Sequence, residues 1–314
     1  MRRIVLHAIV LVITLLVCAC GAEVDQESAS PVVGDPYQDD ASWTAELEDH
    51  RQEIDDFLRT SNTSPMAGTQ YLKSEPVDQV FLTRQGKTFA LADSAGPGAV
   101  LRATRQEDVW HWYDEGSEIV CRVGDEIVES GNALEESATL ELGDLFLRLH
   151  PSEDRVTFIV FDPEREEKVS FEHLFYYPPD RDFAVDATLV PFPEPDEIEM
   201  LTSRDLKKTF YRYAKIRFEV NGQAQELTGF KYELTGEGST SLFIPFRDAT
   251  TSRETYGAGR FLEIDEPDDK HFVLDFNRAF NPLCNYSPAY NCAIPPRENH
   301  LDVAIEAGEM TYPH

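Results

Sequence analysis

Basic residues are scarce in this chain. Its 314 residues include 28 lysines and arginines against 58 aspartates and glutamates, which gives a formal net charge of −30. A nucleic-acid-binding protein needs a basic surface to meet the phosphates, so this charge argues against nucleic acid as a partner. The charge equally disfavours adsorption of the protein body onto anionic lipid.

The sequence also lacks the short fingerprints of the common enzyme classes. It contains no Gly-x-Ser-x-Gly, no Walker loop, no dinucleotide-binding glycine motif and no His-Glu-x-x-His. The histidines do not fall at metal-ligand spacings, so we expect neither a metal nor a cofactor. What the chain does have is a hydrophobic share of 41%, which excludes a disordered protein and suffices for a sizeable core.

A long apolar run occurs at the beginning of the chain, where residues 4–17 follow Arg2 and Arg3. A membrane-spanning helix needs about 20 apolar residues, so this run is too short to span but has the length of a signal-peptide core. It ends in Val17-Cys18-Ala19-Cys20, which resembles the bacterial lipoprotein signal. The alternative is an ordinary secretory signal that is cut nearby.

The resemblance to a lipoprotein signal implies how the chain is processed and where it is located. Residues 1–19 would be removed as a signal peptide, and Cys20 would take the lipid. No later stretch is apolar enough to span, so we expect an acidic body tethered to a membrane of the bacterial cell envelope and facing the periplasm or exterior. Residues 20–40 are acidic, contain Ser and Pro, and are predicted to be a flexible spacer.

Hydrophobic periodicity predicts one helix and many strands. A helix is expected at 42–59, capped by Ser42, with an apolar stripe formed by Trp43, Leu47, Ile54, Phe57 and Leu58. A period of two with intervening turn signals then predicts strands at 79–83, 87–91, 99–103, 118–123, 138–142, 145–150 and 155–161.

The second half of the chain repeats this pattern after a proline-rich stretch, 176–196, that we expect to cross between two halves. Strands are predicted at 210–220, 223–234, 240–246, 256–264 and 271–276, followed by a short helix at 298–307. Asn221-Gly222 permits positive φ at both turn positions and predicts a tight hairpin.

These elements define the expected fold class. It is mainly β, with two packed halves that are each a β-sandwich or a partly open barrel, an N-terminal amphipathic helix and a short C-terminal helix. The first half is expected to span 41–185 and the second 186–314.

Several motifs lie close together in the second half. They are Pro245-Phe246-Arg247-Asp248-Ala249-Thr250, Thr255-Tyr256-Gly257-Ala258-Gly259-Arg260, the stretch from Asp275 to Cys284, and the stretch from Pro295 to Leu301. In these motifs the chain resembles the domain of unknown function 1684 family. The resemblance implies a predominantly β fold and supplies no activity, because the family is uncharacterised.

The same motifs supply the candidate binding residues. Arg260 is a permanent cation whose planar fork suits a carboxylate, and Asp248 or Asp275 could pair with it. Such a cluster could bind an anionic or polyhydroxylated small molecule, or its residues could satisfy the backbone of turns and strand ends. The candidates are Asp248, Thr250, Thr255, Tyr256, Arg260, Asp275, Asn277 and Asn281.

Three cysteines remain after Cys18 and Cys20. Cys284 and Cys292 lie eight residues apart across a loop-forming segment, and in an exported protein a disulfide between them is the first expectation. Free thiols, metal ligation and a nucleophilic thiol are the alternatives. Cys121 alternates with its neighbours in a predicted strand and is expected to be a small buried hydrophobe.

Two classes of function therefore remain open. We favour an exported, lipid-anchored envelope protein with a binding or structural role and a polar pocket in its C-terminal third. The alternative is a small-molecule enzyme, such as a hydrolase, that uses Asp248, Tyr256, Arg260 and Asp275.

Overall fold

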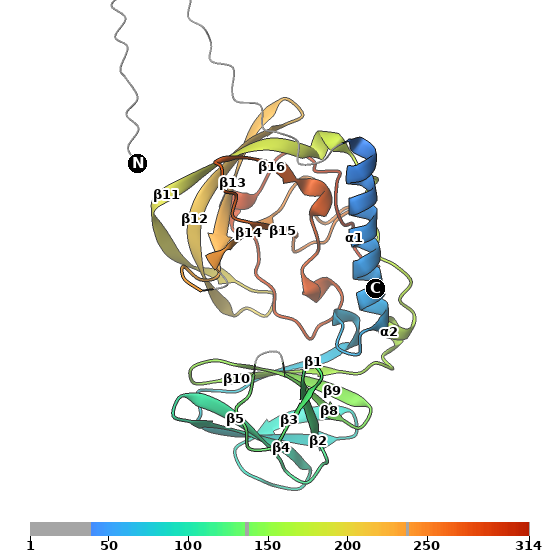
Figure 1. Ribbon diagram of the computed structural model, residues 1–314, viewed down its shortest axis with the longest axis vertical. Coiled ribbons are helices and arrows are strands. Elements are labelled where there is room, and N and C mark those ends of the chain that lie inside the picture. The colour runs from blue at the N-terminus through green and yellow to red at the C-terminus, as the bar shows by residue number, and fades with distance from the viewer. Residues whose placement is uncertain (1–38, 136–137, 237–238, 314) are drawn as a thin grey trace, which may run out of the picture. The chain divides into compact units, whose positions relative to one another are not determined.

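The computed structural model describes residues 39–135, 138–236 and 239–313 (Figure 1). The predicted signal peptide, the lipid-accepting Cys20 and all but the last two residues of the predicted spacer lie outside these ranges. None of the helices in the described part of the chain is long and apolar enough to cross a membrane.

The predicted N-terminal helix is confirmed as α1, Asp40–Thr60. Its N-cap is Asp39 and not Ser42. The Asp39 carboxylate accepts from the Ser42 backbone N–H at 2.8 Å, and the Ser42 hydroxyl accepts from the Asp39 backbone N–H. The apolar stripe is confirmed at Trp43, Leu47 and Leu58, which are buried. Phe57 is instead 47% exposed.

In the described residues of the first half, ten strands form two antiparallel sheets. The six-stranded sheet has the order β1-β10-β9-β8-β6-β7, and the four-stranded sheet has the order β3-β2-β4-β5. Their bounds are β1 Gly68–Lys73, β2 Gln79–Gln85, β3 Thr88–Ala92, β4 Ala99–Gln106, β5 Val109–Asp114, β6 Val120–Val123, β7 Glu126–Val128, β8 Thr139–Leu142, β9 Leu145–Pro151 and β10 Val156–Phe161.

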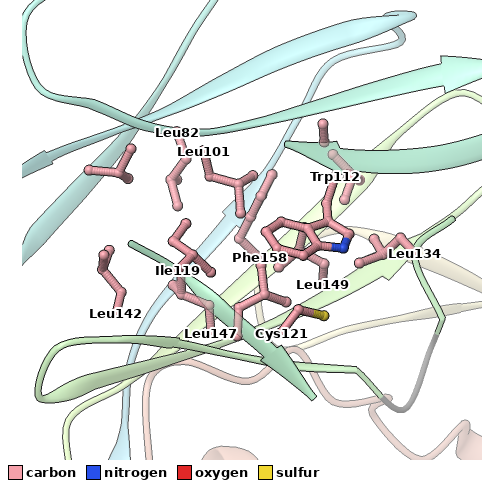
Figure 2. Packing of buried hydrophobic residues seen from close by; sticks show 14 of the residues in the cluster. Leu82, Leu101, Trp112, Ile119, Cys121, Leu134, Leu142, Leu147, Leu149 and Phe158 are labelled. Atoms are coloured by element: carbon pink, nitrogen blue, oxygen red, sulfur yellow. The ribbon is translucent and has the colours of Figure 1, made fainter. Parts of the chain in front are cut away.

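The inner faces of these two sheets share one apolar core, which makes the first half a sandwich. Figure 2 shows Leu82 and Leu101 from the smaller sheet in the same cluster as Leu147 and Phe158 from the larger one. Cys121 is buried in this core, as predicted, and burial raises the pKa of its thiol to about 11.

The second half is a curved, half-barrel sheet of six strands with the order β15-β14-β13-β12-β11-β16 (Figure 1). The mainly β class predicted from the sequence is confirmed. The short helix α2, Glu166–Val169, precedes the sheet. The strands are β11 Ala184–Leu201, β12 Lys207–Val220, β13 Gln223–Lys231, β14 Ser241–Phe246, β15 Arg260–Asp265 and β16 His271–Asp275.

The hairpin at Asn221-Gly222 is confirmed, with φ of 53° and 71° at the two turn residues. The proline-rich stretch is not a simple crossover, because β11 runs through most of it. Its pairing with β16 ends at Thr188, and its register with β12 breaks between Pro191 and Asp196. Prolines are tolerated there because the strand no longer has a neighbour on its other side that needs their N–H groups.

The predicted C-terminal helix is wrong. Within 298–307 the backbone makes only part of the short 3-10 helix Arg297–Asn299. The remaining backbone bonds of this stretch go to the sheet and to side chains: Leu301 donates to the Arg247 carbonyl, and Ile305 donates to the Asp248 carboxylate. Those external partners replace the internal hydrogen bonds of a helix.

Candidate functional site

The Arg260 side chain is fully buried at the start of β15. Its guanidinium Nη2 lies 3.4 Å from Asp248 Oδ2 and donates to the Ile305 carbonyl at 2.8 Å, while Nη1 donates to the Ala307 carbonyl. Burial lowers the pKa of Arg260, and the Asp248 charge opposes that shift. The pair therefore fixes the chain's last segment against the sheet and presents no free cation to a ligand.

Two threonines complete this closed network. The Thr250 hydroxyl donates to the Asp248 carboxylate at 2.9 Å and lies 2.9 Å from the Thr255 hydroxyl. Both threonines are buried. The structure thus brings Asp248, Thr250, Thr255 and Arg260 together, with their hydrogen bonds directed at one another and at the backbone.

Asp275 and Asn277 belong to a second network that holds α1. Asp275 Oδ2 accepts from the Trp43 indole N–H at 2.9 Å, and its Oδ1 accepts from the Asn277 backbone N–H at 2.9 Å. The Asn277 amide exchanges two bonds with the Asp180 backbone, at 2.8 and 2.9 Å. These contacts join the helix, the entry to β11 and the end of β16.

Asn281 belongs to a third network around Glu309, a buried acid that is not among the predicted site residues. The Glu309 carboxylate accepts from the Asn281 backbone N–H at 2.8 Å, from its side-chain amide at 2.7 Å and from the Tyr286 hydroxyl at 2.5 Å. Burial raises the pKa of Glu309 to about 7. No pattern in the sequence separates this acid from the other carboxylates.

Gly259 explains one feature of the motif that precedes Arg260. Its φ is +97°, and a Cβ there would lie 2.5 Å from the Phe246 carbonyl oxygen. The backbone does not require glycine at position 257. A Cβ added there would have the Ser252 hydroxyl as its nearest neighbour, at 3.1 Å. Only the second glycine of the pair is therefore demanded by the backbone.

Tyr256 is the candidate that lies elsewhere. Its hydroxyl donates to the Cys284 carbonyl at 3.3 Å and lies 3.8 Å from Cys284 Sγ. Cys284 and Cys292 are free thiols, so the predicted disulfide is not formed in the structure. The Cys284 backbone N–H instead donates to Cys292 Sγ at 3.3 Å. Free thiols are one of the alternatives that the sequence leaves open.

A cavity of about 530 Å³ lies beside this thiol pair. None of the eight predicted ligand residues lines it. The lining residues are mainly aromatic or aliphatic, and they are Tyr71, His150, Thr157, Ile159, Lys208, Phe210, Tyr232, Phe243, Phe261, Glu263, Phe280, Pro282, Leu283, Tyr290, Asn291, Cys292 and Ala293.

Five of those rings form a continuous aromatic wall. Phe243 stacks on Phe210 at a centroid distance of 5.4 Å and meets Phe261 edge to face at 4.8 Å. Tyr232 lies 5.3 Å from Phe243, and Phe280 lies 6.0 Å from Phe261. Phe210 lies near the start of β12, Tyr232 follows β13, and Phe243 lies near the start of β14. Antiparallel pairing therefore brings all three to the same end of the sheet.

A few polar groups interrupt the apolar lining. Lys208 and Glu263 each contribute an ionisable group, and burial raises the pKa of Glu263. Asn291 Oδ1 is buried and finds no hydrogen-bond partner among the described residues. Across residues 39–135, 138–236 and 239–313, no group of three or more His, Cys, Asp and Glu side chains could hold a metal ion.

Residues 169–310 match the model of a family described as a protein of unknown function, DUF1684. The chain belongs to this family. The matched region contains all eight predicted ligand residues, both neighbouring thiols and the aromatic wall.

Comparison with solved structures and curated proteins adds no activity. The chain is similar to an uncharacterised protein of Haloarcula marismortui whose structure was solved by NMR. The identity is 35%, over 48% of this chain and 83% of that one, with a TM-score of 0.40. No curated protein matches the chain.

The cavity could not be predicted from the sequence, because its lining comes from residues far apart in the chain. The sequence did contain part of a signal for the aromatic wall. One end of three strands joined by hairpins is marked by Phe210, Tyr232 and Phe243. Alternation along each strand would have placed such rings on one face. The Cys292 segment and β10, which complete the lining, are not adjacent to these strands in the sequence.

Proposed function

We propose that this DUF1684 protein is an exported, lipid-anchored binding protein that holds a small, largely apolar or aromatic molecule in the aromatic cavity. The observation that supports the proposal most strongly is the wall of five contacting rings around about 530 Å³ of space. Ligand sites of drug-sized molecules have volumes of roughly 300 to 1,000 Å³ and mainly apolar linings.

The chemistry of the lining narrows the class of ligand. Ring faces and edges favour a flat aromatic molecule through offset and edge-to-face contacts. Asn291 also lines the cavity, and its side-chain amide favours a ligand that carries a hydrogen-bonding group. The ligand we propose is therefore aromatic, uncharged over most of its surface, and carries at least one N–H or O–H group.

The anchoring part of the proposal rests on the lipoprotein-like signal before Cys20. Two or three acyl chains hold a protein at a bilayer, because each buried CH₂ contributes about 0.8 kcal/mol. In bacteria fed a labelled fatty acid, we expect label on the protein and none on the Cys20→Ser variant. An unlabelled wild-type protein would contradict the proposed lipid anchor and would leave the proposed ligand binding in the cavity untested by this experiment.

Binding can be tested with N-phenyl-1-naphthylamine, a neutral aromatic probe with one N–H group. The chain from Gly21, which keeps every described element, avoids lipid and detergent that would themselves take up the probe. We expect saturable one-to-one binding with a rise in probe fluorescence. Ala293→Phe, which places a ring in the cavity, should weaken binding at least about tenfold.

Phe57→Ala is the matched control, because Phe57 is an exposed aromatic on α1 that does not line the cavity. It should leave the dissociation constant unchanged. Unsaturable binding, or equal affinity in Ala293→Phe and wild type, would exclude the cavity as the binding site.

The donor requirement has a separate test. The phenyl ether of 1-naphthol has the shape of the probe but lacks its N–H group. We expect it to bind the wild type about three- to tenfold more weakly, and to bind Asn291→Leu as well as the amine does. If both probes bound the wild type with equal affinity, the proposal of an apolar ligand would stand, and the proposal that the ligand needs a hydrogen-bond donor would be wrong.

A further inference from the structure

Two cysteine thiols of the family region lie side by side and are held by different parts of the fold. Cys284 lies in the short 3-10 helix Leu283–Asn285. Cys292 is paired with the chain just after β11: the Ser203 backbone N–H donates to the Cys292 carbonyl at 2.8 Å, and the Cys292 N–H donates to the Ser203 hydroxyl at 3.1 Å. Neither thiol is fully buried, and Cys292 lines the aromatic cavity.

The immediate surroundings make the two sulfurs unequal. Cys284 Sγ faces the Tyr256 hydroxyl at 3.8 Å, while Cys292 Sγ accepts the Cys284 backbone N–H at 3.3 Å. The hydrogen bond from the Cys292 thiol lowers the pKa of Cys284, with further contributions from Tyr256 and Ser203 against the effect of burial. The same interaction and burial raise the pKa of Cys292.

This asymmetry is the arrangement of a nucleophilic thiol and a resolving thiol. A thiolate at neutral pH attacks, and a neighbouring protonated thiol completes the reaction. Cys121 offers an internal contrast, because it is buried in the first-half core and its thiol has a raised pKa. Proximity and access therefore distinguish the pair from the remaining described cysteine.

We propose that Cys284 and Cys292 form a reversible thiol–disulfide exchange site that reacts with small disulfides at the edge of the aromatic cavity. The Cys284 thiolate attacks one sulfur of the disulfide R–S–S–R, forms a Cys284–S–S–R bond and releases R–S⁻. The Cys292 thiol then loses its proton and attacks Cys284 Sγ. The internal disulfide forms, and the second R–S⁻ leaves.

The two steps are balanced. The protein dithiol is oxidised by two electrons and loses two protons, and the small disulfide is reduced to two thiols. Tyr256 is a positioning residue in this scheme, because its hydroxyl acts on the sulfur of Cys284 and not on the incoming disulfide. The inference does not depend on a ligand occupying the cavity.

Glutathione disulfide is a suitable probe, and peptide mass spectrometry of the full chain reports each cysteine separately. The protein is first reduced, freed of reductant without oxygen, and then exposed to the probe. We expect the wild type to end as a Cys284–Cys292 disulfide that reduced glutathione reopens. Cys292→Ser should stop with one glutathione bound to Cys284, and Cys284→Ser should react at least about tenfold more slowly.

The pH profile of alkylation by iodoacetamide supplies a readout that needs no cysteine variant. Half-maximal reactivity of Cys284 in the wild type is expected below about pH 8.5, the value of an ordinary thiol. Tyr256→Phe should move it to higher pH, because the hydroxyl that stabilises the thiolate is gone. Cys121 should remain unmodified in folded protein.

Three results would overturn the proposal. One is a pair that is already oxidised after purification and is not reduced by glutathione, which would identify a structural disulfide. The second is half-maximal alkylation of Cys284 above pH 8.5, the value of an ordinary thiol. The third is glutathione on Cys284 of the wild type with no internal disulfide at any time.

Discussion

The C-terminal half contains two regions that differ in what their residues do. Around Arg260, charged and hydroxyl side chains are buried and direct their hydrogen bonds at one another and at the backbone. Around Phe243, ordinary aromatic residues line a cavity of about 530 Å³. The chemically unusual residues stabilise the fold, and the ordinary ones form the space a ligand can enter.

The physical reason lies in the cost of burial. A buried charge without a partner is expensive, so a chain that buries Arg260 must supply Asp248 and several carbonyl oxygens together. Such sets are recognisable in a sequence because they require rare residue types at fixed spacings. A cavity forms wherever side chains from neighbouring strands leave space unfilled. The sequence does not show this, because those strands are far apart along the chain.

The largest expected effect comes from breaking the buried ion pair. Arg260→Ala should lower the free energy of unfolding by about 3 to 5 kcal/mol, because it leaves the Asp248 carboxylate buried and two carbonyls without a donor. Denaturant titration measures this loss. Arg217→Ala, which removes the exposed Glu226 pair, should cost less than about 1 kcal/mol. Equal losses would contradict a structural role for the buried pair.

The second effect is a pH dependence from Glu309. Its pKa is raised from 4.5 to about 7, so the folded state binds a proton that the unfolded state has already released. Stability should therefore fall as the pH rises from about 4.5 to about 7, by roughly 3 kcal/mol from this group. Glu309→Gln should flatten that part of the pH profile measured by denaturant titration. A profile identical to the wild type would show that Glu309 ionises normally.

A smaller effect separates the two motif glycines. Gly259→Ala should cost about 2 kcal/mol, because it strains a φ of +97° and places a methyl group 2.5 Å from the Phe246 carbonyl. Gly257→Ala should cost less than about 1 kcal/mol, since the Ser252 hydroxyl can rotate away. Melting temperatures of the two variants compare them directly, and a larger drop for Gly257→Ala would reverse the assignment.

The smallest change in stability, with a clear change in affinity, is expected at the cavity wall. Tyr232 is 38% exposed, so Tyr232→Ala should lower the free energy of unfolding by no more than about 1 kcal/mol. It should still weaken binding of N-phenyl-1-naphthylamine severalfold, because the ring contacts both Phe210 and Phe243. Unchanged probe fluorescence would remove Tyr232 from the site.

Much of the fold could be predicted from local patterns. Alternation placed most of the strands, and Asn221-Gly222 located a hairpin, because both signals depend on residues adjacent in the sequence. The eighteen residues of β11 were missed because Pro191 and its neighbours lie where the strand lacks a second partner, which sequence does not reveal. The helix at 298–307 was wrong because external acceptors take its hydrogen bonds.

The sequence pointed to some of the residues that gather around Arg260, but it did not point to the cavity, which none of the eight predicted ligand residues lines. Asp248, Thr250, Thr255 and Arg260 do converge, but the converged cluster is closed by Ile305 and Ala307 from the chain's last segment. The neighbouring thiols were identified as a pair. The unequal environments of Cys284 and Cys292 depend on Tyr256 and Ser203, whose proximity no local pattern encodes.

The most direct test compares the two regions in one assay. Binding of N-phenyl-1-naphthylamine is titrated against Ala293→Phe, which fills the cavity, and against Arg260→Lys, which perturbs the buried network but keeps its charge, both under conditions where each variant is folded. We predict that Ala293→Phe weakens binding at least about tenfold and that Arg260→Lys binds like the wild type. Binding that survives Ala293→Phe and is lost in Arg260→Lys would contradict the account.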